Sequence, residues 1–221
     1  MKKVCAVLGV LLLGVAAFAE SGNWQSYIGA GVTVPVYQHK VKDDGSRTLF
    51  GALADIGVFG VNTNNGFTFK AGFAAGWGTT ADIPLYDDSR KHGFASNIEG
   101  GIGYSFIRSS DTVLSVLGTF GAGSYSFEGS KSITYGSDNL KLSDSDVGGY
   151  GFGLGAEVSL IKRLGEKLHL FANVGARYVI DGYETTEYSG DHDDIEYAVS
   201  FKRSTDGGFA VTPTIGLCWS L

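Results

Sequence analysis

Apolar residues alternate with small or polar residues in eight separate stretches of the sequence. The pattern is clearest where Phe67, Phe69 and Phe73 are separated by Thr68 and other small or polar residues. Because successive side chains of a β-strand point to opposite faces, each stretch predicts a strand with one apolar and one small, polar face. The stretches are residues 24–37, 50–60, 67–78, 94–107, 113–127, 149–161, 168–180 and 208–221.

The fifth stretch does not keep a single phase. Phe120 fits one alternation, whereas Tyr125 and Phe127 fit the other. One extra residue in a strand reverses the faces of all residues that follow it. We therefore expect a β-bulge near Gly121 or Gly123.

The connections between the stretches are alternately long and short. That alternation, with strands of nine or more residues, is typical of an up-and-down transmembrane β-barrel. The sequence therefore predicts an all-β fold, an eight-stranded antiparallel transmembrane β-barrel. The short links are residues 62–66, 108–112 and 162–167, and the long links are 38–49, 79–93, 128–148 and 181–207.

The last long link has an alternation of its own, in Ile195, Tyr197, Val199 and Phe201. One interpretation is that the last two strands continue beyond the membrane as a ribbon, with a bulge at 206–208. The rival interpretation is a ninth strand at 195–203. We favour the ribbon because nine strands would give an odd count.

The non-apolar face consists mostly of Gly, Ala and Ser, which suits a crowded lumen better than a water-exposed surface. The apolar face carries aromatic residues at both ends of the strands, as expected for rings that sit at the headgroup level of a bilayer. Near the short links these are Trp24, Phe67, Tyr104 and Trp219, and near the long links they are Phe50, Trp77, Phe94, Tyr150, Tyr178 and Phe209.

The final stretch, GFAVTPTIGLCWSL, resembles the closing strand of bacterial outer-membrane barrels, which usually ends in Phe or Trp. Here two residues follow Trp219. The pattern across residues 20–221 resembles the eight-stranded OmpA-, OmpX- and OmpW-like families in architecture, but no motif singles out one of them. The resemblance implies outer-membrane lipid, periplasmic chaperones and the barrel-assembly machinery as partners. It also implies periplasmic termini and extracellular long loops in a diderm bacterium.

The amino-terminal residues predict a cleaved secretory signal peptide over 1–19. Lys2 and Lys3 precede a short apolar run, which ends at an A-x-A site. Without residues 1–19 the chain has 15 basic and 23 acidic residues, and this net charge of −8 argues against a nucleic-acid partner. Cys218 is then the single cysteine, and we expect it to fill space in the lumen.

The inward face carries a small set of ionisable residues, which inside a membrane barrel must be paired or hydrated. One interpretation is a polar network that lines or gates a narrow conduit. The other, which we favour, is a salt-bridged plug in a lumen filled by side chains. The inward glycines would then leave room for Tyr27, Phe59, Phe171 and Arg177. The ionisable set is Asp55, Lys70, Glu99, Glu157, Arg177 and His169.

The last long link is acidic, and its GDHDD run at 190–194 offers oxygen ligands for a divalent cation. A solvated acidic tip is the simpler interpretation, so we expect no metal and no cofactor. No nucleophile is placed beside a base, so we expect no catalytic site and no enzyme. The acids of this link are Asp181, Glu184, Glu187, Asp191, Asp193, Asp194, Glu196 and Asp206.

Two functions remain open at this point. The first is a small passive channel, OmpW-like, for small solutes, apolar ones among them. The second is a non-conducting barrel whose long loops serve adhesion, host-surface binding or envelope integrity.

Overall fold

The computed structural model describes residues 22–42, 45–80, 91–129, 133–135, 140–142, 144–192 and 195–221. Within these ranges, no helix is long and apolar enough to cross a membrane. The predicted signal peptide lies outside the described residues. The strands are β1 (Trp24–Thr33), β2 (Val36–Val41), β3 (Gly45–Asn62), β4 (Phe67–Thr80), β5 (Lys91–Arg108), β6 (Thr112–Gly129), β7 (Ile133–Tyr135), β8 (Leu140–Leu142), β9 (Asp144–Arg163), β10 (Leu168–His192) and β11 (Ile195–Ser220).

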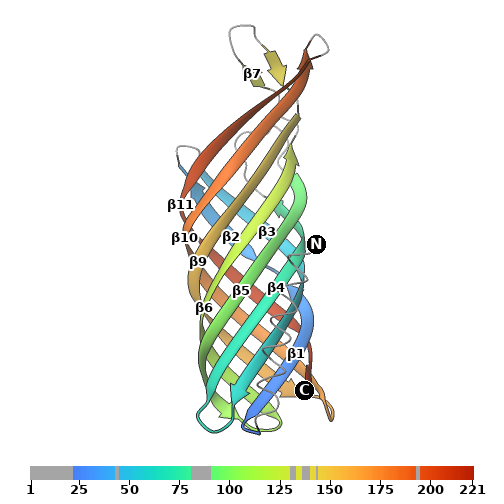
Figure 1. Ribbon diagram of the computed structural model, residues 1–221, viewed down its shortest axis with the longest axis vertical. Coiled ribbons are helices and arrows are strands. Elements are labelled where there is room, and N and C mark those ends of the chain that lie inside the picture. Colours follow the sequence, from blue (N-terminus) through green and yellow to red (C-terminus); the bar gives the residue numbers. More distant parts are fainter. Residues whose placement is uncertain are drawn as a thin grey trace.

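The long strands form a closed antiparallel ring with eight positions (Figure 1). Strands β1 and β2 share one position, because both pair with β3 on one side and with β11 on the other. The other seven positions belong to β3, β4, β5, β6, β9, β10 and β11. The predicted eight-stranded antiparallel up-and-down barrel is therefore confirmed.

The carboxyl terminus lies at the end of the barrel where the short turns are (Figure 1). The backbone N–H of Leu221 donates to the carbonyl of Ser26, and that of Ser220 donates to Lys167. The beginning of β1 and the end of β11 therefore meet at the same rim. We call this the turn rim and the opposite end the ribbon rim.

Two details of the strands differ from the sequence predictions. The first predicted strand is interrupted at Val34 and Pro35, which separate β1 from β2. The predicted bulge near Gly121 or Gly123 is wrong, because β6 pairs with β9 without a register shift along its whole length. Tyr125 simply lies inside the barrel while Phe120 lies outside, so an aromatic residue in the lumen caused the apparent change of phase.

Strands β10 and β11 continue as a paired ribbon, from Tyr183 opposite Ser204 to His192 opposite Ile195. Here β11 extends well beyond β2, whereas β9 accompanies β10 as far as Asp144 opposite Ser189. The rival ninth strand at 195–203 is thereby excluded, because this segment is part of β11. One bulge lies in β10 at Ile180, and the expected bulge in β11 contains Gly207, at φ 95°. The short hairpin of β7 and β8, which the sequence did not predict, lies near the top of the ribbon (Figure 1).

The barrel has an apolar outer face and carries buried charged residues inside, unlike a water-soluble protein. Ile102, Val174 and Ile215 are 59%, 58% and 58% exposed on the outer face. Meanwhile Glu157 and Arg177 are buried in the lumen. Such an exterior suits the hydrocarbon of a bilayer, in which a closed ring of strands leaves no open sheet edge.

Candidate functional site

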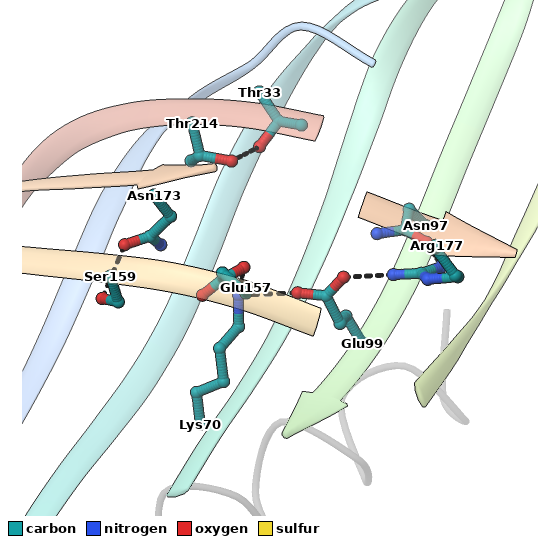
Figure 2. Close-up of polar contacts among 9 residues, drawn as sticks. All are labelled: Thr33, Lys70, Asn97, Glu99, Glu157, Ser159, Asn173, Arg177 and Thr214. Atoms are coloured by element: carbon teal, nitrogen blue, oxygen red, sulfur yellow. Dashed lines mark hydrogen bonds and ion pairs between the residues drawn. The ribbon is translucent and has the colours of Figure 1, made fainter. Parts of the chain in front are cut away.

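A layer of charged side chains from several strands lies in the lumen (Figure 2). The ammonium of Lys70 lies 2.6 Å from Oε1 of Glu99 and 2.5 Å from Oε2 of Glu157. Glu99 also pairs with Arg177, whose Nη1 donates to Oδ1 of Asn97 at 2.9 Å. Glu99 therefore joins both cations through its two carboxylate oxygens.

Asp55 lines the same cavity as Lys70 and Glu99. The charged layer, defined as Asp55, Lys70, Glu99, Glu157 and Arg177, thus contains three carboxylates and two cations. Neutral pairs lie beside it, such as Ser159 with Asn173 and Thr33 with Thr214, each with 2.7 Å between the bonded oxygens (Figure 2). The buried charges of this layer require oppositely charged or hydrogen-bonding partners, because desolvation penalises an isolated ion by several kcal/mol.

Glycines on neighbouring strands make room for the long side chains of this layer. A Cβ on Gly153 would lie 2.9 Å from Cδ of Arg177, and one on Gly121 would lie 2.9 Å from its Nη1. A Cβ on Gly31 would lie 2.9 Å from Cζ of Phe171. The inward glycines therefore accommodate large side chains rather than leaving the lumen empty at these positions.

An apolar cluster closes the lumen between the charged layer and the turn rim. Leu117 and Val61 are completely excluded from solvent, and their neighbours are nearly so. A lumen that admitted water at this level would expose these side chains, so the described residues leave no aqueous path there. This apolar seal consists of Tyr27, Phe59, Val61, Val113, Leu117, Ile161, Phe171 and Cys218.

His169 belongs to the region of the seal and is not joined to the charged layer. Its ring meets Tyr27 edge-on with the centroids 5.1 Å apart, and its Nδ1 lies 3.1 Å from the carbonyl oxygen of Lys167. Beside the seal, a buried hydroxyl chain runs from Thr68 through Ser105 to Ser115, with O–O distances of 2.6 and 2.7 Å.

The seal should contribute strongly to barrel stability. Replacing Leu117 with Ala should lower the free energy of unfolding by about 2–5 kcal/mol, because the cavity lies where the surrounding strands cannot collapse. The measurement is urea unfolding of the barrel in lipid vesicles, followed by tryptophan fluorescence. The control is Val116→Ala on the exposed face of the same strand. Equal losses for the two variants would contradict a packed seal.

Two cavities flank the charged layer. The lower cavity, of about 60 Å³, is lined by Asp55, Lys70 and Glu99 together with residues of the seal. The upper chamber, of about 90 Å³, lies between Arg177 and the ribbon rim. Its wall is mainly apolar, although polar groups line its floor. Its apolar lining residues include Leu49, Leu53, Phe127, Val179 and Ala210.

A second buried polar group closes the lumen above the upper chamber. Glu184 of β10 lies 3.4 Å from Nη2 of Arg47 on β3 and 3.8 Å from Nε2 of His39 on β2. The hydroxyl of Tyr125 on β6 donates to Glu184 at 3.0 Å and lies 3.2 Å from Nε2 of His39. We call His39, Arg47, Tyr125 and Glu184 the mouth cluster.

Glu184 lies beyond the girdle residue Tyr178, outside the membrane-spanning part of β10. Burial raises the pKa of Glu184, but hydrogen bonding with His39 and the charge of Arg47 outweigh this, together with the hydroxyl of Tyr125. Its pKa therefore lies below the ordinary value, and the carboxylate is charged at neutral pH.

The mouth cluster is not apparent from the sequence. The acidic pattern of residues 181–207 predicts a solvated position for Glu184, whereas Glu184 is 2% exposed in the lumen, so that expectation is wrong. The bulge at Ile180 reverses the phase of β10, so even-numbered residues point inward above it. The side chains of the GDHDD run lie outside the described residues; among those that are described, no metal-binding cluster of His, Cys, Asp and Glu occurs.

The aromatic residues assigned to the two girdles lie on the outer face. At the turn rim, the Trp24 ring contacts the rings of Phe67 and Phe69. At the other end, Trp77 pairs in register with Phe94, and Tyr178 pairs with Phe209. Nine residues of the predicted girdles are at least 41% exposed: Phe50, Phe67, Trp77, Phe94, Tyr104, Tyr150, Tyr178, Phe209 and Trp219.

Solved structures share this fold although the sequences have diverged widely. A major outer membrane protein from Thermus thermophilus is 14% identical with a TM-score of 0.53, covering 87% of this chain and 99% of that chain. OprG from Pseudomonas aeruginosa is 13% identical with a TM-score of 0.50, covering 89% and 96%. No protein-family model and no curated sequence matches this chain. The chain therefore has the fold of the eight-stranded bacterial outer-membrane β-barrel superfamily.

Proposed function

We propose that the protein is an outer-membrane barrel that admits small, mainly apolar solutes into its upper chamber, as a small passive channel that is closed at rest. The observation that carries the proposal is the upper chamber itself, a mainly apolar cavity of about 90 Å³ on the ribbon-rim side of the charged layer. Apolar cavities in proteins stay dry and bind apolar molecules such as benzene. The function is binding and passage, with no catalytic step.

The closed layers support a preference for apolar solutes over ions. A hydrated ion would have to cross the charged layer, where Lys70 and Arg177 are paired, and then the apolar seal. Both steps remove water from the ion, and the side chains of the apolar seal offer no charged group to replace that water. A neutral solute in the upper chamber loses little hydration on entry.

We also propose that the ribbon rim faces the cell exterior and the turn rim faces the periplasm. The β7–β8 hairpin and the β10–β11 ribbon then become the extracellular parts. In this orientation, periplasmic chaperones and the barrel-assembly machinery would receive the chain, and the last strand would be the segment recognised.

A chamber-filling substitution tests the channel proposal. Gly123 lines the chamber, and a Cβ on it would meet only Ser96 O at 3.6 Å and Asn97 Oδ1 at 3.9 Å. Gly123→Leu should therefore fold and place its side chain in the chamber. Uptake of a toluene-sized hydrocarbon by cells carrying equal surface amounts should fall by at least about tenfold, which corresponds to about 1.4 kcal/mol.

The matched control is Ala122→Leu, one residue away, on the outer face of the same strand. It should take up the hydrocarbon as the wild type does. If both variants retain uptake, or if the wild type gives no more uptake than cells lacking the protein, the channel proposal fails.

A second function is favoured by the ribbon, which stands well above the girdle. On its outer face, the ammonium of Lys202 lies 3.5 Å from the ring centroid of Tyr183, whose ring also contacts Tyr150. Tyrosine is enriched at protein interfaces. We propose host-surface or matrix binding by this ribbon as the alternative. Purified barrel that binds host matrix and shows no hydrocarbon uptake would favour it.

A further inference from the structure

The charged layer has one more acidic than basic side chain. Lys70 and Arg177 face the three carboxylates of Asp55, Glu99 and Glu157. When all five groups are ionised, one negative charge is left over whichever pairs are drawn. Ionisable groups inside a membrane barrel must be paired or hydrated, so this surplus requires a positive partner or water.

Asp55 is the carboxylate of the layer that lacks a cation. Glu99 lies within 4.0 Å of two cationic groups and Glu157 of one, whereas no cationic group of the described residues comes that close to Asp55. Glu157 shows the same surplus more weakly. Its Oε1 is buried and has no hydrogen-bond partner in the described part of the chain.

Asp55 lines the lower cavity, and a row of neutral polar side chains on four neighbouring strands lines the same cavity. The row crosses the barrel wall at one level, because each member is opposite the next in the strand ladders. We call it the polar row. It consists of Thr33 of β1, Thr214 of β11, Asn173 of β10 and Ser159 of β9.

The polar row offers oxygen atoms that can accept further contacts. The hydroxyls of Thr33 and Thr214 bond to each other, and that of Ser159 donates to Oδ1 of Asn173 (Figure 2). Hydroxyl and amide oxygens each have two acceptor lone pairs, so these bonds leave acceptor capacity unused. Carboxylate and neutral oxygens together are the ligands that hard cations take. The cavity of about 60 Å³ has room for such an ion with some water, since one water molecule needs about 10–15 Å³.

We propose that the lower cavity binds one small monovalent cation of the Na⁺ type, with the carboxylate of Asp55 as its charged ligand and oxygens of the polar row and of water as its neutral ligands. One positive charge brings the charged layer to zero, whereas a divalent cation would reverse its sign. Lys70 does not take this place, because its ammonium is held by Glu99 and Glu157. The site is a function beyond the passage of solutes and does not rest on it. The rival source of positive charge is a proton on one of the carboxylates.

An exchange of the cation in solution tests the site. Urea unfolding of the wild-type barrel in zwitterionic lipid vesicles is compared in NaCl and in tetramethylammonium chloride, at equal ionic strength and pH. Tetramethylammonium carries four methyl groups around its charge and cannot be coordinated by oxygen ligands. The folding equilibrium constant should be about tenfold larger in NaCl, as expected at a Na⁺ concentration about ten times the dissociation constant.

Two variants assign the effect to the proposed ligands. Asp55→Asn removes the surplus charge at nearly constant volume, so the two salts should give the same stability. In tetramethylammonium chloride this variant should be more stable than the wild type, whereas a carboxylate with only a structural role would leave it less stable in both salts. Thr214→Val keeps the charge but removes one hydroxyl oxygen. It should raise the Na⁺ concentration of half-maximal effect about threefold or more, the equivalent of one lost polar contact.

The matched control is Asp111→Asn, which removes an exposed carboxylate near the turn rim and should respond to Na⁺ as the wild type does. The cation site is overturned if the wild type is equally stable in both salts, which would leave a proton as the compensating charge. It is also overturned if Asp55→Asn keeps the full difference between the salts. Should Asp55→Asn fail to fold, the Thr214→Val barrel decides, and an unchanged Na⁺ response there overturns the site.

Discussion

Replacing Glu99 with Ala should destabilise the barrel by about 3–5 kcal/mol, the range expected when one partner of a buried ion pair is removed. Glu99 is the carboxylate that contacts both Lys70 and Arg177. Without it, Lys70 keeps Glu157, but Arg177 loses its salt-bridge partner and keeps only its hydrogen bond to Asn97 in the charged layer. The measurement is urea unfolding of vesicle-embedded barrel.

An exposed ion pair supplies the control for this prediction. Arg163 and Asp111 lie 3.6 Å apart near the turn rim, with side chains 39% and 66% exposed. Asp111→Ala should change the free energy of unfolding by no more than about 1 kcal/mol, because solvent screens the pair. If Glu99→Ala were equally mild, water would be reaching the charged layer and the lumen would not be closed.

A second large effect is expected at Gly216 on the closing strand. A Cβ at this position would lie 2.3 Å from the carbonyl oxygen of Ala30 and 2.6 Å from Cε1 of Phe171. The first contact is with backbone of the paired strand, which cannot rotate away. Gly216→Val should therefore reduce stability by about 3 kcal/mol or more, at or above the upper end of ordinary overpacking.

Gly118 is the matched control, since it lies on the outer face and a Cβ there would meet only the carbonyl oxygen of Ile102, at 3.8 Å. Gly118→Val should fold and unfold as the wild type does. Both variants are compared by heat-modifiable mobility and by urea midpoint. A stable Gly216→Val barrel would mean that the Phe171 ring and the β1–β11 seam are free to shift.

The membrane-spanning part of the fold was predictable from the sequence because alternation there has a single cause. Lipid outside and a crowded lumen inside force period-two patterning on every strand, so Lys70, Glu99, Glu157 and Arg177 were correctly expected to share the lumen. Distances between them were not predictable. They depend on the stagger between strands that are not neighbours in the ring, and no local pattern encodes that stagger.

The prediction of which side chains face inward failed where an aromatic residue points into the lumen and where a bulge shifts the alternation of apolar and polar residues. Tyr125 is aromatic yet points inward, because it reaches Glu184 with its hydroxyl. Ile180 is an extra residue that no composition signal marks, and it reverses the face of all that follows in β10. The upper chamber could not be predicted from the sequence for a further reason. An internal void is what remains after all side chains have packed, and sequence shows only the side chains.

The paired bulges of β10 and β11 allow the inward-facing positions above the bulges to differ in parity from those below them. Because both strands gain one residue at the same level, their mutual register is preserved across the bulges while the inward face changes parity. The sequence of the ribbon is thereby freed from the parity imposed on the barrel wall. Residues of the ribbon can diverge without altering which side chains face outward in the barrel wall below.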